Sequence, residues 1–181
     1  MLLDTPICDF GWQAPDFTLK DPDGKSFTLS QSLGEKGLLI MFICNHCPYV
    51  QAIASRLVAD TQALMNEGIN VAAVMSNDYR YVPADSPVNM KRFATQHGFN
   101  FPYLVDEGQV VGRTYGAICT PDFFGFNKNG ELQYRGRLDN ALMGSATQRQ
   151  PELINAMQQI ALTGKGPQNQ YPSVGCSIKW N

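Results

Sequence analysis

The stretch 37–50, GLLIMFICNHCPYV, joins a continuous apolar run to a C-x-x-C motif and a proline. An apolar run of this length is typical of a strand that is buried on both faces of a sheet. Pro48 suits the first turn of a helix, where its missing N–H group is not needed. We therefore predict that the motif, residues 44–47, lies where a buried strand passes into a helix.

The residues after Pro48 predict a helix and then a second buried strand. Apolar side chains recur at helical spacing from Val50 to Met65, and Gly68 ends the helix. The next stretch, 69–76, reads INVAAVMS and is again apolar. A strand, a helix and a strand in this order form a βαβ unit, whose crossover is expected to be right-handed.

The rest of the chain predicts two hairpins and three further helices around this unit. The turns at 21–25 and 127–130 carry Asp-Gly and Asn-Gly between apolar segments, which is typical of hairpins. The predicted strands are 17–20, 26–29, 101–106, 122–126 and 132–138, and the predicted helices are 87–97, 108–116 and 151–163. This order predicts an α/β fold with a mixed central β-sheet flanked by helices. The length favours one domain, with a core at 10–165 and a C-terminal tail at 166–181.

Composition and charge argue against several classes of partner. The 181 residues include 14 basic and 16 acidic side chains and no run of Lys or Arg, so nucleic acid is not an expected partner. The N-terminus has neither the basic leader nor the apolar run of a secretory signal. No stretch approaches the about 18 apolar residues of a membrane helix. We therefore expect a cytoplasmic protein without a membrane partner.

The cysteines carry the strongest chemical signal. Their number is odd, which does not fit a secreted disulfide framework; they are Cys8, Cys44, Cys47, Cys119 and Cys176. A helix N-terminus carries about half a positive charge and favours a thiolate. A two-residue spacer also brings two sulfurs within bonding range. A redox-active dithiol is the first interpretation of Cys44 and Cys47, beside half of a zinc site and an inert pair.

His46 is a candidate for tuning this pair. A charged imidazole there would stabilise the thiolate of Cys44, the sulfur that we expect to attack a partner disulfide. It would also make the pair more oxidising than a thioredoxin that has Gly-Pro between its cysteines. The alternative is an exposed residue at the helix start without a chemical role.

Thr120 and Pro121 precede the predicted strand 122–126 and offer an extended backbone edge to a partner peptide. Cys119 is either a buried small apolar residue or a further redox thiol. Cys176 lies in the tail sequence VGCSIKW. It is either packed on the body near Trp180 or a third thiol that the tail brings to Cys119 or to the C-x-x-C pair.

Several motifs resemble one known superfamily in a consistent order along the chain. They are GWQAPDFTLKDPDGKSFTL (11–29), NHCPYV (45–50), SND (76–78), PADSPVNM (83–90), YGAICTPDFFGF (115–126), YRGRLD (134–139) and GCSIKW (175–180). They resemble the AhpC/TSA superfamily of thioredoxin-fold proteins, and within it the peroxiredoxin-like 1 branch. The resemblance implies a thioredoxin fold in which Pro121 is a cis-proline that faces the redox pair.

The chain departs from the active-site patterns of two relatives within this fold. With the peroxidatic cysteine of peroxiredoxins on Cys47, Cys44 stands at their threonine position and Ile40 at their proline position. In the thioredoxin pattern, Ile43 replaces a tryptophan and Leu38 replaces a buried aspartate. Without the peroxidase groups, nothing obvious stabilises the developing charge on the leaving oxygen of a peroxide. Disulfide exchange therefore ranks above peroxide reduction.

The expected function is that of a thiol–disulfide oxidoreductase that uses Cys44 and Cys47 without a cofactor or a resident metal. Its partners would be disulfide-containing proteins or small-molecule thiols and disulfides. The expected supporting residues are Asn45, His46, Pro48, Thr120 and Pro121. The alternatives are a thiol peroxidase, with Cys119 or Cys176 as an extra thiol, and a non-catalytic module that binds a partner or a metal. The sequence predicts no particular oligomeric state.

Overall fold

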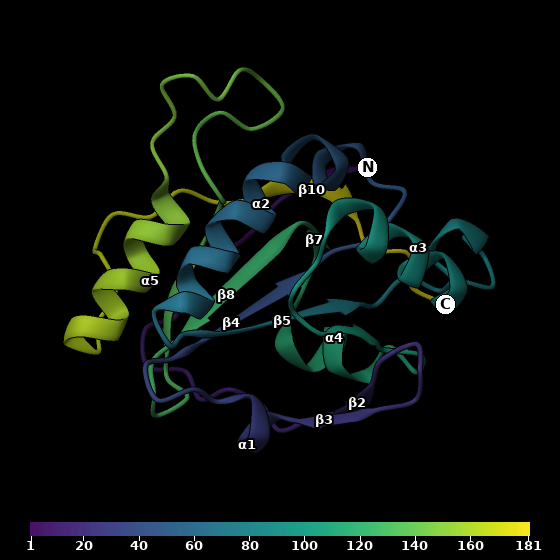
Figure 1. The fold of residues 1–181 in the computed structure, drawn as a ribbon, viewed down its shortest axis with the longest axis horizontal. Coiled ribbons are helices and arrows are strands. Elements are labelled where there is room, and N and C mark those ends of the chain that lie inside the picture. Colours follow the sequence, from purple (N-terminus) through teal and green to yellow (C-terminus); the bar gives the residue numbers. More distant parts are fainter.

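A seven-stranded mixed sheet forms the centre of the molecule (Figure 1). The computed structural model describes all 181 residues. Along the sheet the strands are β3 (Ser26–Thr28), β2 (Thr18–Lys20), β6 (Tyr103–Val105), β5 (Asn70–Met75), β4 (Leu38–Phe42), β8 (Asp122–Phe126) and β9 (Leu132–Gly136). Strands β4, β5 and β6 are parallel, whereas the other pairs are antiparallel. The predicted mixed α/β sheet is confirmed.

Strand β4 lies in the middle of this sheet, and all five of its residues are buried. Its side chains alternate between two apolar clusters, one on each face of the sheet. Leu39 and Met41 belong to the cluster beneath helix α2 (Pro48–Asn66), whereas Ile40 and Phe42 belong to the opposite one. Burial on both faces is the physical reason why this strand reads as a continuous apolar run.

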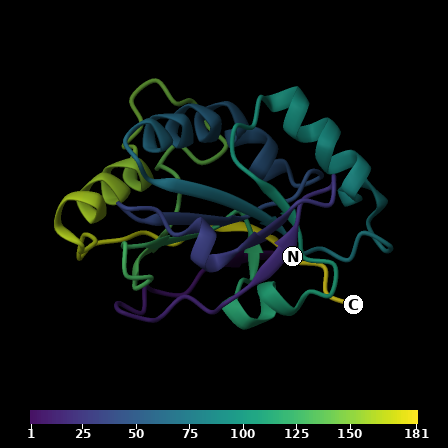
Figure 2. The same cartoon turned by 60° about the horizontal axis from the view of Figure 1, so that its bottom comes forward.

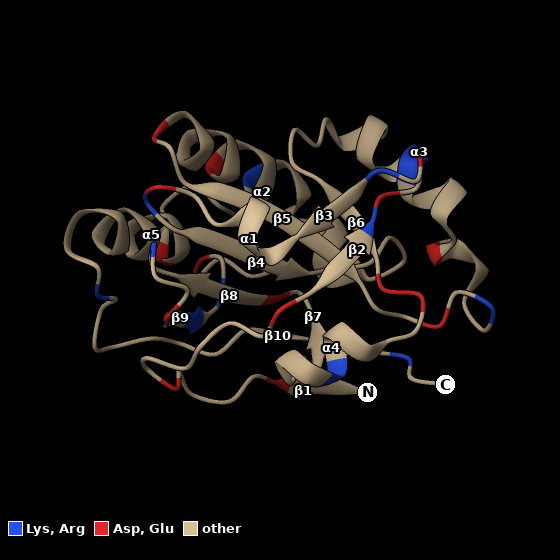
Figure 3. Cartoon of the chain, turned by 90° about the horizontal axis from the view of Figure 1, so that it is seen from below, with Lys and Arg blue, Asp and Glu red and all other residues tan.

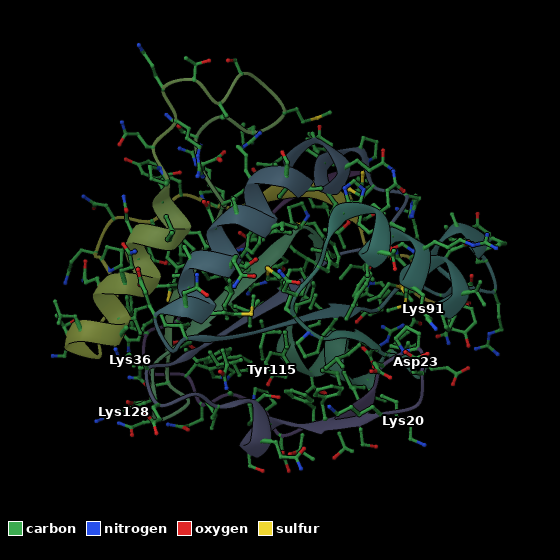
Figure 4. The ribbon with its side chains drawn as sticks, viewed as in Figure 1. Lys20, Asp23, Lys36, Lys91, Tyr115 and Lys128 are labelled. Atoms are coloured by element: carbon green, nitrogen blue, oxygen red, sulfur yellow. The ribbon has the colours of Figure 1, made fainter.

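Helices cover both faces (Figure 2). On one face lie α2, α3 (Pro87–His97) and α5 (Glu152–Thr163), and on the other lies α4 (Val110–Tyr115) with residues near the N-terminus. Tyr115, labelled in Figure 4, packs edge-on against Phe124 and Phe126 of the second cluster. Its hydroxyl donates to the carbonyl of Pro15 at 2.6 Å, which ties the N-terminal segment to α4.

A second, three-stranded sheet joins the two ends of the chain. Its order is β1 (Leu2–Asp4), β10 (Val174–Ser177) and β7 (Cys119–Thr120), all antiparallel. The sequence predicts none of these strands, because each is short and none shows a clear alternation. The short helices α1 (Leu29–Ser32) and η1 (Pro83–Asp85) were also not predicted.

The longer predicted elements agree with the structure. The helix predicted at 87–97 has the bounds of α3, and both predicted hairpins are present as β2–β3 and β8–β9. The strand predicted at 101–106 is limited to β6, and the helix predicted at 108–116 is limited to α4. The N-terminal hairpin also joins the main sheet, because Lys20 of β2 pairs with Val105 of β6.

Charged residues are spread over many elements, with basic and acidic positions interspersed (Figure 3). One exposed ion pair joins α3 to the turn of the first hairpin, where the Lys91 ammonium lies 2.7 Å from the Asp23 carboxylate (Figure 4). No helix in the structure combines the length and the apolar character that crossing a membrane requires.

Candidate active site

The C-x-x-C motif occupies the junction between β4 and α2. Cys47 is the N-cap residue of α2, and Pro48 is in its first turn. The backbone N–H groups of Val50 and Gln51 donate to the Cys47 carbonyl at 3.1 and 3.0 Å. The motif therefore lies at the positively polarised end of a 19-residue helix.

The two sulfurs of the motif are buried and reduced, and both contact Thr120. Cys44 is 1% exposed and Cys47 is 0% exposed. The Cys47 thiol donates to the Thr120 carbonyl at 3.2 Å, and the Cys44 sulfur lies 3.4 Å from the Thr120 hydroxyl. The Thr120–Pro121 peptide bond is cis, as the family resemblance implies. The structure thus brings Cys44, Cys47 and the Thr120–Pro121 segment together.

The electrostatics of the pair are the reverse of the expectation that the thiolate forms on Cys44. The interaction with Cys44 lowers the pKa of Cys47 to about 5, and Thr120 and the backbone at Val50 and Cys176 act in the same direction against burial. The interaction with Cys47 raises the pKa of Cys44, and burial and the charge on Asp85 raise it further. The first proton therefore leaves Cys47.

Asp85 is the residue of this site that the sequence analysis missed. Its buried carboxylate accepts hydrogen bonds from the backbone N–H groups of Asn45 and His46, at 2.7 and 3.2 Å. It also accepts from Nδ2 of Asn77 at 3.0 Å. The only signal in the sequence was its place in the PADSPVNM motif, since nothing in the local pattern connects η1 to the cysteines.

His46 is paired with Asp85 instead of being free to serve Cys44. Its Nδ1 lies 2.5 Å from the Asp85 carboxylate and 3.7 Å from the Cys44 sulfur. The hydrogen bond to Asp85 raises the pKa of His46, which favours the imidazolium. Burial would raise the pKa of Asp85, but the hydrogen bonds from His46 and Asn77 outweigh it and lower that pKa. The negative charge of Asp85 offsets the field that His46 would exert on Cys44.

Asn45 fixes the loop between the two cysteines. Its side-chain oxygen accepts from the Tyr103 hydroxyl at 2.9 Å, and its amide nitrogen donates to the Ala84 carbonyl at 3.0 Å. Its own carbonyl accepts from Nε2 of Gln51 at 2.8 Å. Asn45 therefore positions the motif through partners on β6, η1 and α2.

Three residues in and near the motif lie close enough together to hold a metal ion. The ligand atoms of Cys44, His46 and Asp85 lie within 4.8 Å of one another, and these are residue types that zinc accepts. Cys119 does not belong to this group. The Nδ1 atom that faces the group already bonds to Asp85, so a metal would have to displace that hydrogen bond. The atoms that could bind a metal therefore already take part in hydrogen bonds with one another.

The other two candidate thiols differ in their surroundings. Cys119 is 0% exposed, its thiol donates to the Pro121 carbonyl at 3.6 Å, and burial raises its pKa. Cys176 is half-buried in β10, where it lies opposite Thr120. Strand β10 pairs with one edge of β7, and β7 is the outer strand of that sheet. An extended backbone edge for a partner peptide at Thr120 and Pro121 therefore stays a prediction.

Residues 10–135 match the AhpC/TSA family. The chain belongs to the AhpC/TSA family. Among characterised relatives of this AhpC/TSA protein is the thiol-disulfide oxidoreductase ResA of Halalkalibacterium halodurans. The two are 26% identical over 129 residues, which are 71% of this chain and 69% of that protein. For the ResA of Bacillus thuringiensis, the match covers 66% of the relative, so the chain spans about two thirds of these proteins.

Solved structures confirm the fold of this AhpC/TSA protein. An uncharacterised conserved protein from Geobacillus kaustophilus is 39% identical, with a TM-score of 0.93 over 100% of this chain and 97% of that one. The thioredoxin domain of a thiol-disulfide oxidoreductase from Bacteroides vulgatus has a TM-score of 0.65 at 17% identity, over 84% of this chain and 97% of that one. The predicted thioredoxin fold is thereby confirmed.

Proposed function

We propose that this AhpC/TSA protein is a thiol–disulfide oxidoreductase that cycles Cys44 and Cys47 between a dithiol and a disulfide. The observation that carries the proposal is the contact of both sulfurs with Thr120 at the N-terminal end of α2. The ResA relatives support it through their name, thiol-disulfide oxidoreductase. The partners would be proteins or small molecules that contain a disulfide.

The protonation states of the pair suit this exchange. The reduced pair holds its thiolate on Cys47 and its proton on Cys44, because the pKa of Cys47 is lowered and that of Cys44 is raised. When a partner disulfide is reduced, the Cys44–Cys47 bond forms and the partner disulfide breaks, so two electrons pass to the partner, whose sulfurs leave as one thiol and one thiolate. Cys44 gives up its proton in that step, and the proton passes to the partner sulfur that leaves as a thiol.

A thiol peroxidase is the second candidate, favoured by the AhpC/TSA family and by the lowered pKa of Cys47. A peroxidase needs a donor that stabilises charge on the departing oxygen of the peroxide. Arg135, the buried arginine of β9, does not meet this need, because it forms a two-point ion pair with Asp122 at 2.9 and 3.2 Å. We therefore rank peroxide reduction below disulfide exchange.

Insulin reduction in the presence of dithiothreitol tests the proposed function. The wild-type protein is expected to accelerate the reaction, because its thiolate attacks the insulin disulfides. The Cys47→Ser variant is expected to fall to the rate of dithiothreitol alone, and Cys44→Ser is expected to be slower than wild type. Cys8→Ser is the matched control, because Cys8 is half-buried and outside the site. Equal acceleration by wild type, Cys44→Ser and Cys47→Ser would refute the proposal.

A further inference from the structure

Strand β10 occupies the backbone edge beside the two sulfurs. In the antiparallel pair, Cys176 lies opposite Thr120 and Ser177 lies opposite Cys119, and the N–H of Ile178 donates to the Ile118 carbonyl at 3.2 Å. A partner peptide that adds a strand to a sheet edge makes this kind of pairing. The C-terminal segment of the chain thus lies where an added strand would lie.

The approach of β10 to this edge is unusually close. A Cβ atom at position 175 would lie 1.9 Å from the Thr120 carbonyl oxygen and 3.1 Å from the Pro121 nitrogen. Only glycine avoids that collision, because it has no Cβ. Gly175 therefore allows the next residue, Cys176, to be held against the loop that both sulfurs contact.

Cys176 packs against the apolar cluster that contains Cys47. The Cys47 thiol donates to the carbonyl of Thr120, the residue opposite Cys176, at 3.2 Å. The same apolar cluster also contains Cys44. The strand pairing therefore places Cys176 next to the Thr120 backbone that the Cys47 thiol contacts.

The three sulfurs differ in how accessible they are. Cys44 is 1% exposed and Cys47 is 0% exposed, whereas Cys176 is partly exposed. Thiol–disulfide exchange requires the attacking sulfur to reach the sulfur that it attacks. A bulky external thiol meets Cys176 before it meets either member of the buried pair.

We propose that Cys176 is a third redox thiol, which passes the disulfide between the buried Cys44–Cys47 pair and an external thiol by forming a Cys47–Cys176 bond. The proposal rests on the function proposed above. The external reactant is defined by its chemistry as a thiol, either a small molecule or a cysteine of a protein.

The first step is an exchange inside the protein. The Cys176 thiolate attacks the Cys47 sulfur of the Cys44–Cys47 disulfide, so the bond to Cys44 breaks and the Cys47–Cys176 bond forms. Cys44 leaves as a thiolate and takes up a proton, which balances the proton that Cys176 lost. The protein neither gains nor loses electrons in this step. The Thr120 hydroxyl, 3.4 Å from the Cys44 sulfur, is placed to donate to the departing thiolate.

The second step involves the external thiol. Its thiolate attacks the Cys176 sulfur and forms a mixed disulfide, and Cys47 leaves as a thiolate. A low pKa makes a thiol a good leaving group, and the pKa of Cys47 is lowered to about 5. A second external thiol then attacks the mixed disulfide, which releases the external disulfide and leaves all three protein thiols reduced. The external thiols supply the two electrons.

Peptide mapping tests whether the bond forms. Trypsin places Cys44 and Cys47 in peptide 37–56 and Cys176 in peptide 166–179. The Cys44→Ser variant is oxidised with diamide, its free thiols are blocked with N-ethylmaleimide, and the digest is analysed without reduction. The expected product is a disulfide between the two peptides. Recovery of peptide 166–179 with N-ethylmaleimide on Cys176, while Cys47 is oxidised, would overturn the proposal.

Kinetics test whether the bond is used. Oxidised wild-type protein and oxidised Cys176→Ser and Cys176→Ala variants are mixed with reduced glutathione, and their free thiols are counted over time. Both variants are expected to be reduced about tenfold more slowly than wild type, because the accessible sulfur is missing. Cys8→Ser is the matched control and is expected to keep the wild-type rate, since Cys8 is also half-buried.

The outcomes separate this proposal from the function on which it rests. If the Cys44–Cys47 disulfide forms and the Cys176 variants react at the wild-type rate, the proposal for Cys176 fails and the proposed function stands. If no Cys44–Cys47 disulfide forms in wild type or in Cys176→Ser, the proposed function itself fails.

Discussion

The two cysteines of the motif differ in the groups that point at their sulfurs, although both are buried. Cys47 is the N-cap of α2, and its interactions with Cys44 and Thr120 lower its pKa. The Cys44 sulfur lies within 4.8 Å of the Asp85 carboxylate, whose charge opposes a thiolate there. The helix N-terminus therefore does not stabilise a thiolate equally at the two positions, and the N-cap residue Cys47 is stabilised more than Cys44.

We predict that the thiolate of the reduced protein titrates with a midpoint at about pH 5, as followed by its ultraviolet absorbance. In Cys44→Ala the midpoint is expected to shift upward, because the interaction with Cys44 is the largest cause of the low pKa of Cys47 and alanine has no donor. The transition should be absent from Cys47→Ser. A low midpoint that persists in Cys47→Ser and disappears in Cys44→Ala would contradict this assignment.

The lowered pKa of Cys47 also makes the stability of the reduced protein depend on pH. The pKa of Cys47 in the folded protein lies below the ordinary value of 9.0, so its contribution to the stability of the reduced form is fully present above pH 9.0. That contribution is lost as the pH falls towards about 5.

The sequence alone could predict the cysteines, because a C-x-x-C motif between an apolar run and a helix-starting proline is a local pattern. The cis-proline followed from the family resemblance. Asp85 could not be predicted in this way, since its bonds to Asn45 and His46 join residues 40 and 39 positions apart. Only the packing of η1 against the motif reveals the role of this carboxylate.

At the scale of elements, periodicity predicted the long helices, and turn residues predicted the hairpins. Strand β4 and helix α2 each carry enough apolar residues to show their period. Strands β1, β7 and β10 have two to four residues each and exist because the chain ends meet. Pairings that join distant segments of the chain leave no local pattern, which is why the segment at 166–181 was predicted only as a tail.

The close contact of β10 with β7 predicts the effect of Gly175→Ala. The added methyl group would collide with the Thr120 carbonyl, so the strand must move away. We expect a loss of about 2 kcal/mol in the free energy of unfolding, as is usual for overpacking. Urea denaturation measures the loss, and hydrogen exchange should show faster opening of β10. Gly108→Ala is the control, because its Cβ would meet only a Val110 methyl group at 3.8 Å. Equal stability of the two variants would argue against a tightly held β10.

At the scale of the whole molecule, the fold brings four distant segments to the carboxyl end of β4. They are the C-x-x-C motif, η1 with Asp85, the Thr120–Pro121 loop and β10. In open α/β sheets this end of the parallel strands is the usual place for a functional site. The apolar clusters on the two faces of the sheet hold these segments in place, so the site depends on the complete fold.

The stabilised thiolate of Cys47 also affects the reduction potential of the Cys44–Cys47 pair. A thiolate that is stabilised at Cys47 favours the reduced form over the disulfide. In the sequence, His46 predicts a pair that is more oxidising than that of thioredoxin. The structure supports the same direction for another reason, since the hydrogen bonds at Cys47 stabilise the thiolate.

The reduction potential of the Cys44–Cys47 pair tests the central claim most directly. The protein is equilibrated in glutathione redox buffers, quenched with acid and alkylated, and its free thiols are counted by mass. We expect one reversible two-electron transition, at a potential above the about −270 mV of thioredoxin, and no such transition in Cys47→Ser. A wild-type protein that shows no reversible transition, or that shows the same transition as Cys47→Ser, would contradict the account.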